Sequence, residues 1–295
     1  MPQDTTLAPP STLPRDREIV ADGRKSVAQG DKVWLHARDE FLSDVDRIMT
    51  TVIESGQPVV YGVGIGRELG AFDDHGAVRD HYTATYGAIH VRDWRTFIEL
   101  RSNWYTFFDG VVNYDDHAAG ENTNRESIVL FPLDDQEGIL GELAWTRLPE
   151  QEIADPCLDP SPAATAKADV NRHLLDAYIA ALKAGDVAGA VGMFTHDGQV
   201  AARDYGADPE RYRALRGPEL LSFHQRFADR FDVLALDIVR IVVTDWYAFA
   251  ELHWHVREKA SGKAMRMHTV EMLPILAPGK FVARIGWGTE LVPDA

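Results

Sequence analysis

The chain has 295 residues, 45% of them hydrophobic, and a formal net charge of −16 at pH 7. This length predicts two domains that each bury a core, and the acidic charge disfavours binding to the phosphate backbone of nucleic acids. No apolar stretch approaches the roughly 18 residues of a membrane helix, and no basic segment followed by an apolar one opens the sequence, so we expect a cytoplasmic protein without membrane contacts. The single cysteine, Cys157, excludes an intrachain disulfide and lies in no metal-binding motif.

Two proline-containing segments divide the chain. Residues 1–16 combine Pro, Thr and Asp, which predicts a disordered arm. Residues 148–169 contain several prolines and no apolar periodicity, which predicts a linker. The remaining sequence forms a first domain over 17–147 and a second domain over 170–295.

The two domains repeat each other at a spacing of 142 residues. Trp104 in NWYTFF corresponds to Trp246 in DWYAFA. The same spacing relates Pro132 to Pro274, Trp145 to Trp287, Asp44-Val45 to Asp186-Val187 and Gly56-Gln57 to Gly198-Gln199. Since one ungapped spacing holds for all five landmarks, we predict a tandem duplication.

In the second domain, helices precede strands. Apolar residues at helical spacing predict a helix over 170–184 that ends at Gly185, and Asp186 is placed to cap the short helix that follows. Residues 199–205 look extended, and Pro218 opens a helix over 217–231. Strands are then expected at 233–243, 246–257, 264–276 and 281–291. This order predicts an α+β fold with helices packed on one face of a curved antiparallel sheet.

The order of elements and the segment AYIAALKAGDVAGAVGMFTHDGQV at 177–200 resemble the nuclear-transport-factor-2-like superfamily, especially its ketosteroid isomerases and SnoaL-like polyketide cyclases. The resemblance covers 170–291 and reaches the first domain through the internal repeat. It implies two cone-shaped domains, each a curved antiparallel sheet wrapped on N-terminal helices around an apolar pocket, which pair through their sheets as an intrachain pseudo-dimer. Because this fold hosts isomerases, dehydratases, epoxide hydrolases, cyclases and binding proteins, the fold alone does not name the reaction.

Three residues of the second domain match the isomerase pattern. The resemblance implies that Tyr178 is a phenol donating to a substrate oxyanion, that Asp204 is the general base after a two-residue insertion, and that Glu271 is a protonated acid serving as a second donor. Proton abstraction beside a carbonyl needs such a base, together with donors where negative charge develops. Trp287, Phe223 and His268 are candidates to contact the substrate.

Each of these three residues also fits a structural role. Tyr178 fits a core aromatic residue of the first helix, and Asp204 fits a turn at a strand end. Glu271 is the most informative, because a glutamate on a central strand is costly to bury unless it is paired or protonated. His268 also fits an exposed position.

Glu251, His253 and His255 alternate along one predicted strand. A metal site there would need further ligands from elsewhere in the fold, and a row facing solvent or an interdomain surface is the favoured interpretation. We therefore expect no metal. The sequence also has no dinucleotide-binding or P-loop motif, so we expect no cofactor.

The first domain lacks the candidate carboxylates. The residues 142 positions before Tyr178, Asp204 and Glu271 are His36, Gly62 and Val129. We expect a degenerate copy that serves as a structural partner. The alternative is a different site there, drawn from Arg67, Glu68, Asp73, His81, His90 and Glu99.

The sequence therefore predicts a SnoaL-like or ketosteroid-isomerase-like enzyme of the isomerase or lyase type. Its acid–base chemistry would act without a cofactor on a small hydrophobic molecule that carries a carbonyl or hydroxyl group. Epoxide hydrolysis or epoxide-driven cyclisation is the first alternative, and a non-catalytic module that binds a small molecule or a protein is the second. A further homodimer stays open.

Overall fold

The computed structural model describes residues 31–54, 59–63, 74–134, 138–147, 161–275 and 279–294. The predicted arm at 1–16, residues 148–160 of the predicted linker, and Arg67, Glu68, Asp73 and Cys157 lie outside these ranges. Within them, no helix is long and apolar enough to cross a membrane.

The described residues of the first unit form three helices and a five-stranded sheet. A helix over 31–41 is followed by α2 (Val45–Met49), β1 (Val59–Val63) and α3 (His75–Ala88), and then by β2 (Ile89–Arg101), β3 (Tyr105–Asp116), β4 (Glu121–Pro132) and β5 (Gly141–Arg147). The strand order is β1-β5-β4-β3-β2. Only the β1/β5 pair is parallel among the paired strands of this sheet.

The second unit follows a similar plan, with a longer first helix. Its helices are α4 (Pro162–Ala184), α5 (Val187–Gly192) and α6 (Pro218–Arg230). Its strands are β6 (Phe194–Asp204), β7 (Asp208–Arg216), β8 (Phe231–Val243), β9 (Tyr247–Glu258), β10 (Ala264–Pro274), β11 (Phe281–Gly288) and β12 (Val292–Pro293). They form a sheet of order β7-β6-β11-β10-β9-β8, with β12 paired to β10.

The beginning and end of α4 follow from local chemistry. The Ser161 side chain accepts a hydrogen bond from the Ala164 amide, and Pro162 occupies the first turn, where its missing N–H costs nothing. Gly185 ends the helix at φ 67°, a left-handed conformation that favours glycine. Helix α4 therefore begins at Pro162, inside the stretch assigned to the linker, because a capping serine and proline start a helix as readily as they break one.

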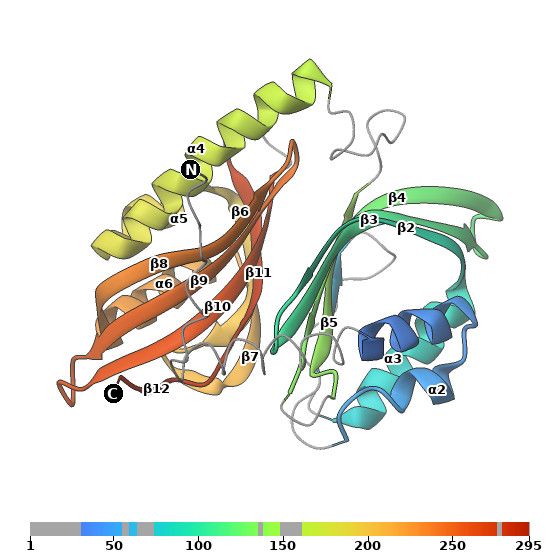
Figure 1. Cartoon of the computed structure of the whole chain (residues 1–295), viewed down its shortest axis with the longest axis horizontal. Helices are drawn as coiled ribbons and strands as arrows, with labels where there is room; N and C mark the ends of the chain where they lie inside the picture. The colour runs from blue at the N-terminus through green and yellow to red at the C-terminus, as the bar shows by residue number, and fades with distance from the viewer. Residues whose placement is uncertain are drawn as a thin grey trace, which may run out of the picture.

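The predicted α+β class is confirmed, with one curved sheet and one set of helices in each unit. Each sheet is mostly antiparallel, but its first strand runs parallel to its last, as β6 does to β11. The sheets face each other, and the helices cover the faces that point away from the partner sheet (Figure 1). Each unit therefore encloses its own space between sheet and helices.

The 142-residue spacing reappears in backbone hydrogen bonds. Ser102 donates to the Tyr105 carbonyl and Thr244 to the Tyr247 carbonyl, each at 2.9 Å. At the same ends of β3 and β9, Leu133 donates to the Trp104 carbonyl (2.9 Å) and Ile275 to the Trp246 carbonyl (2.6 Å). These matching contacts support the tandem duplication, which stays a prediction.

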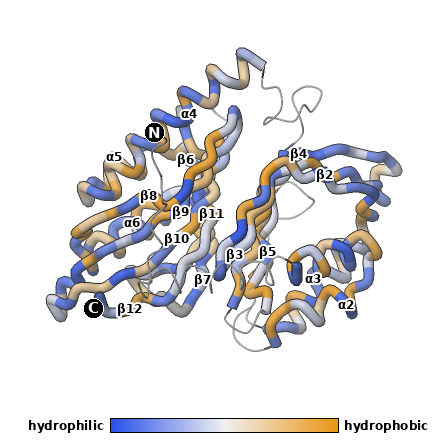
Figure 2. The backbone as a smooth tube through the Cα atoms, viewed as in Figure 1, coloured by the Kyte–Doolittle hydropathy of each residue, from blue (hydrophilic) through white to orange (hydrophobic). Residues whose placement is uncertain are grey.

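The two sheets pack together through a shared apolar cluster, and hydrophobic residues follow the facing strands of both (Figure 2). The rings of Phe107 and Phe249 lie 4.4 Å apart at its centre. Two reciprocal hydrogen bonds flank them: Tyr105 donates to Glu251 (2.7 Å), and Tyr247 donates to Asp109 (2.8 Å). Glu251 therefore faces the first unit, in agreement with the interdomain interpretation of its row.

Asp109 should make stability depend on pH. Burial raises the pKa of Asp109 to about 7, although the Tyr247 hydrogen bond lowers it. Because the unfolded pKa is about 3.9, the folded chain binds this proton more tightly, so the stabilisation is complete below about pH 4 and is lost as the pH rises to 7. Asp109→Asn keeps an acceptor for Tyr247 and removes the titration. We expect the difference in unfolding free energy between wild type and variant, measured in urea, to fall from pH 4 to pH 7; parallel profiles would contradict this.

Candidate functional site

A cavity of about 30 Å³ lies in the second unit between α4, α6 and the concave face of the sheet. Its walls include four large apolar side chains, namely Phe223, Phe227, Trp254 and Met267. Its polar lining includes Asp204, His224, Thr269 and Arg284. The concave face therefore combines an apolar enclosure with a few ionisable groups, which is the usual composition of a small-molecule site.

Asp204, the predicted base, ends β6 and is 2% exposed. Its Oδ2 accepts hydrogen bonds from Nη2 (2.5 Å) and Nε (3.0 Å) of Arg226 on α6. Its Oδ1 is buried and has no hydrogen-bond partner within the described part of the chain. The guanidinium therefore holds the carboxylate in one orientation and leaves one oxygen available to accept a proton.

Glu271 lies on β10 and forms an ion pair with Arg284 of the neighbouring strand β11. Its Oε1 accepts from Nη2 of Arg284 at 2.6 Å, and the side-chain exposures are 1% and 11%. The Arg284 guanidinium is therefore a further donor at this place, which the sequence interpretation did not include.

Two more polar atoms of this ion pair have no hydrogen-bond partner among the residues that the structure describes: Oε2 of Glu271 and Nε of Arg284. The Tyr178 hydroxyl on α4 is likewise buried and without such a partner in the described ranges. Burial, and to a smaller extent Glu271, raises the pKa of Tyr178, while Arg284 lowers it. Tyr178 is thus a neutral phenol beside the ion pair, as its predicted role as a donor requires.

His224 on α6 is a member of the site that the sequence interpretation missed. Its ring meets that of Tyr178 edge to face at 6.3 Å, and its Nε2 is buried without a partner among the described residues. Burial, assisted by Arg284, lowers the pKa of His224 to about 3, so the imidazole is neutral at ordinary pH.

A signal for both missed residues is present in the sequence. His224 shares the buried side of its helix with Leu220 and Phe223. Arg284 is a charged residue between Ala283 and Ile285, which are fully buried. A lone arginine or histidine in such an apolar pattern needs a buried partner or a ligand.

Of the three residues predicted to contact the substrate, one lines the cavity and two do not. Phe223 lines the cavity. Trp287 and His268 do not line it, because they lie on the sheet face turned towards the first unit. Trp287 stacks on Tyr212 at 5.5 Å, and His268 stacks on His253 at 4.1 Å. The reason is strand alternation: Glu271 and Thr269 face the helices, so their neighbours face the other way.

His253 and His255 of β9 lie beside Asp237, a carboxylate on the neighbouring strand β8. Ligand atoms of Asp237, His253 and His255 lie within 4.8 Å of one another. Asp237 is exposed, and Nδ1 of His255 also contacts Asp294 at 3.0 Å. These residues could hold a divalent ion near the surface, remote from the cavity.

Residues 175–284 match the profile of the SnoaL-like domain family. No curated protein matches the chain significantly.

Several solved structures are similar to parts of the chain. One is the epoxide hydrolase/cyclase-like enzyme SalBIII, which has a role in pyran ring formation in the polyether salinomycin: identity is 12%, coverage 45% of this chain and 99% of that one, and the TM-score 0.37. A ketosteroid isomerase-like protein from Erwinia carotovora atroseptica has 19% identity, coverage of 42% and 97%, and a TM-score of 0.34. A protein with a ketosteroid isomerase-like fold from Catenulispora acidiphila, in complex with trimethylamine, has 12% identity, coverage of 40% and 84%, and a TM-score of 0.33.

The profile match spans the helices, the cavity and the ion pair of the second unit. Within the second unit, residues 175–284 are thus similar to the SnoaL-like domain family.

Proposed function

We propose that the second unit is an enzyme of the isomerase or lyase type, which moves a proton in a small hydrophobic molecule carrying a carbonyl or hydroxyl group. One observation carries the proposal: three residues that line the cavity hold buried polar atoms without partners in the described ranges, namely Oδ1 of Asp204, Nε of Arg284 and Nε2 of His224. Tyr178 and Glu271 do not line the cavity themselves, but Glu271 pairs with Arg284 and the Tyr178 ring meets that of His224. Buried polar groups are rarely left unpaired, and a bound polar molecule would satisfy them.

Asp204 would act as the base. Its free Oδ1 would take the proton from the carbon beside the carbonyl, while Arg226 keeps the carboxylate oriented. Tyr178 and Arg284 would donate to the oxygen on which negative charge develops. Neutral His224 is placed to carry a proton between substrate atoms, and Glu271 would position Arg284.

The cavity itself sets the next expectation. A volume of about 30 Å³ is the share of one water molecule in the liquid, so a larger substrate must displace side chains. Phe223 and Phe227 form the helix side of the cavity. We therefore expect substrate binding to move α6.

The direct test is exchange of the proton beside a carbonyl. The purified chain is incubated with small apolar ketones in deuterated water, and loss of the α-proton signal is followed by NMR. Enzyme-dependent exchange, together with dehydration of a matching β-hydroxy ketone, would support the proposal. Absence of exchange with ketones that bind would contradict it and leave a non-catalytic binding module.

Tyr178→Phe should lower the turnover number about 100- to 1000-fold, because it removes one donor to the developing oxyanion. The measurement is steady-state kinetics on the ketone identified above. Tyr212→Phe is the matched control: this buried tyrosine donates to the Ala201 carbonyl on the opposite sheet face, and its loss should leave turnover unchanged. Equal turnover in Tyr178→Phe and wild type would remove Tyr178 from the mechanism.

Epoxide opening is a second candidate, favoured by the water-sized cavity beside Asp204 and the adjacent Glu271–Arg284 pair. Asp204 would then deprotonate a water that attacks an epoxide carbon, and a donor would protonate the leaving oxygen. A terminal epoxide in 18O-labelled water distinguishes the two reactions, since only this one incorporates label into a diol.

A further inference from the structure

The first unit holds its own cavity, of about 90 Å³, between its helices and the concave face of its sheet. Aromatic rings of Tyr82, Tyr86 and Trp94 line it, together with two carboxylates, Glu40 and Glu142. Tyr82 and Glu142 stand 142 residues before His224 and Arg284. The cavity thus occupies the place of the candidate active site but carries different chemistry, and its carboxylates Glu40 and Glu142 are not among the site residues that the sequence suggested for this unit.

A histidine completes the acidic pair. Ligand atoms of His36, Glu40 and Glu142 all lie within 4.8 Å of one another. Nε2 of His36 is 3.5 Å from Oε1 of Glu40, and the two side chains are 0% and 9% exposed. The Tyr82 hydroxyl lies 3.0 Å from Oε2 of Glu142 and 3.2 Å from Nε2 of His36.

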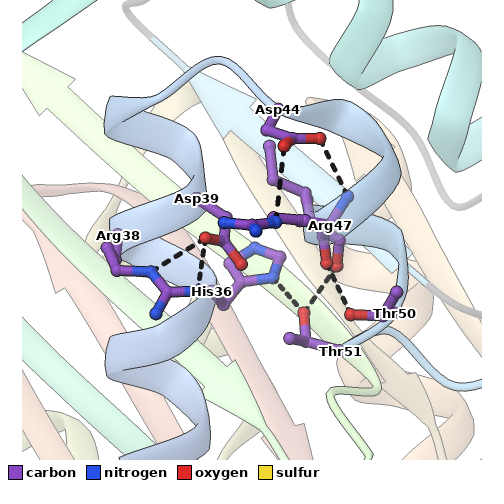
Figure 3. Close-up of polar contacts among 8 residues, drawn as sticks. His36, Arg38, Asp39, Asp44, Arg47, Thr50 and Thr51 are labelled. Atoms are coloured by element: carbon purple, nitrogen blue, oxygen red, sulfur yellow. Dashed lines mark hydrogen bonds and ion pairs between the residues drawn. The ribbon is translucent and has the colours of Figure 1, made fainter.

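The orientation of His36 is set by a threonine (Figure 3). Nδ1 of His36 is 2.5 Å from Oγ1 of Thr51, and that hydroxyl donates its own proton to the Ile48 carbonyl at 2.6 Å. Thr51 must therefore accept from His36, which places the imidazole proton on Nδ1. The lone pair of Nε2 then points at the carboxylates. An N–H held by an outer partner is the arrangement typical of a histidine that ligates a metal.

The cluster has more acceptors than donors. Nε2 of His36 and the oxygens of Glu40 and Glu142 all offer lone pairs, whereas the hydroxyls of Tyr82 and Tyr86 supply one O–H each, towards Glu142 and Glu40. Oε1 of Glu40 is buried and has no hydrogen-bond partner among the residues that the structure describes. Two carboxylates beside an imidazole lone pair repel one another in a buried place unless a proton or a metal cation lies between them.

We propose that the first unit binds a divalent transition-metal ion through Nε2 of His36 and the carboxylates of Glu40 and Glu142. One imidazole and two carboxylates are a donor set that Zn²⁺ takes at about 2.0–2.2 Å, and the 3.5 Å between His36 and Glu40 lets both reach one ion. Three protein ligands leave a coordination position open towards the aromatic cavity. That position suits an apolar molecule with an oxygen donor.

Metal titration of the whole chain tests this directly. The protein is freed of metal with a chelator and titrated with Zn²⁺ by calorimetry, and Co²⁺ is added separately to read ligand geometry by visible absorption. The double variant Glu40→Gln/Glu142→Gln should lower Zn²⁺ affinity at least about 100-fold and abolish the Co²⁺ bands. Thr51→Val, which keeps all three ligands and removes the acceptor of Nδ1 together with the hydrogen bond to the Ile48 carbonyl, should lower affinity about 10- to 100-fold.

The matched control is a variant of the surface group Asp237, His253 and His255 in the second unit. His253→Gln/His255→Gln removes the other group of candidate ligands and should leave the tight site intact. Loss of tight binding in this control, or its persistence in Glu40→Gln/Glu142→Gln, would overturn the proposal. Failure of the wild type to bind Zn²⁺, Mn²⁺ or Co²⁺ would overturn it too. In that case only bound protons would offset the negative charge of Glu40 and Glu142. Circular dichroism checks that each variant is folded. If Glu40→Gln/Glu142→Gln does not fold, Thr51→Val still tests the proposal.

Discussion

Asp204→Asn should lower the turnover number at least about 100-fold, the usual contribution of a general base. The amide has nearly the same shape, so the cavity keeps its form, but its oxygen cannot take a proton from carbon. The Oδ1 of the wild-type carboxylate is the buried atom that Arg226 leaves free, which makes this side chain the base best placed in the site. Steady-state kinetics on an exchanging ketone, with single-turnover measurements, separates loss of chemistry from loss of binding.

The matched control is Asp208→Asn. Asp208 pairs with Asp204 across the β6–β7 turn, but its side chain is 42% exposed and contacts Arg211 at the surface. We expect wild-type turnover in this variant. Asp204→Asn with unchanged turnover would remove Asp204 as the base and transfer attention to His224.

Arg284→Met should lower the free energy of unfolding by about 3–5 kcal/mol, the typical cost of breaking a buried ion pair by removing one partner. Glu271 is 1% exposed and would remain as a buried carboxylate whose main partner is gone. Urea unfolding followed by fluorescence and circular dichroism measures the change. A decrease below about 1 kcal/mol would show that the pair behaves as a surface ion pair instead.

A second variant separates stability from function. Glu271→Leu combined with Arg284→Met replaces the pair by apolar side chains and should recover most of the lost stability. Turnover should stay low, because the donor to the oxyanion is still missing. If the double variant also recovers turnover, Arg284 is not a donor in the reaction.

Local features of the second unit were predictable because their causes lie within a few residues. Gly185 ends α4 in a left-handed conformation, and the Asp186 side chain caps α5 by accepting from the Gly189 amide. Pro218 begins α6. Strand alternation also placed Glu271 on the same face as Thr269, and that face encloses the cavity.

Partners across the fold were not predictable in this way. Asp204 and Arg226 are 22 residues apart, and Glu271 and Arg284 are 13 residues apart on neighbouring strands. Whether such groups meet depends on how α6 packs on the sheet and on the register of β10 against β11, which pairs Glu271 with Gly286. The guanidinium beside Glu271 was missed for this reason, since no local pattern locates it, and the neutral-acid role of Glu271 stays a prediction.

In the first unit, too, contacts between distant residues were not predictable from local sequence patterns. Comparison at the 142-residue spacing aligned His36 with Tyr178, but it compared single positions and so overlooked Glu40 and Glu142. These carboxylates come from a helix and from β5, and the fold alone brings them to one imidazole.

The sequence by itself determined the α+β class, most helices and strands of the second unit, and the burial of Asp204, Tyr178 and Glu271, because hydrophobic periodicity and capping act over a few residues. It missed the strands β7 and β12. Only the tertiary structure decided which charge meets which. Buried polar groups are stabilised by partners from distant strands and helices, and those partners are set by sheet register and helix packing.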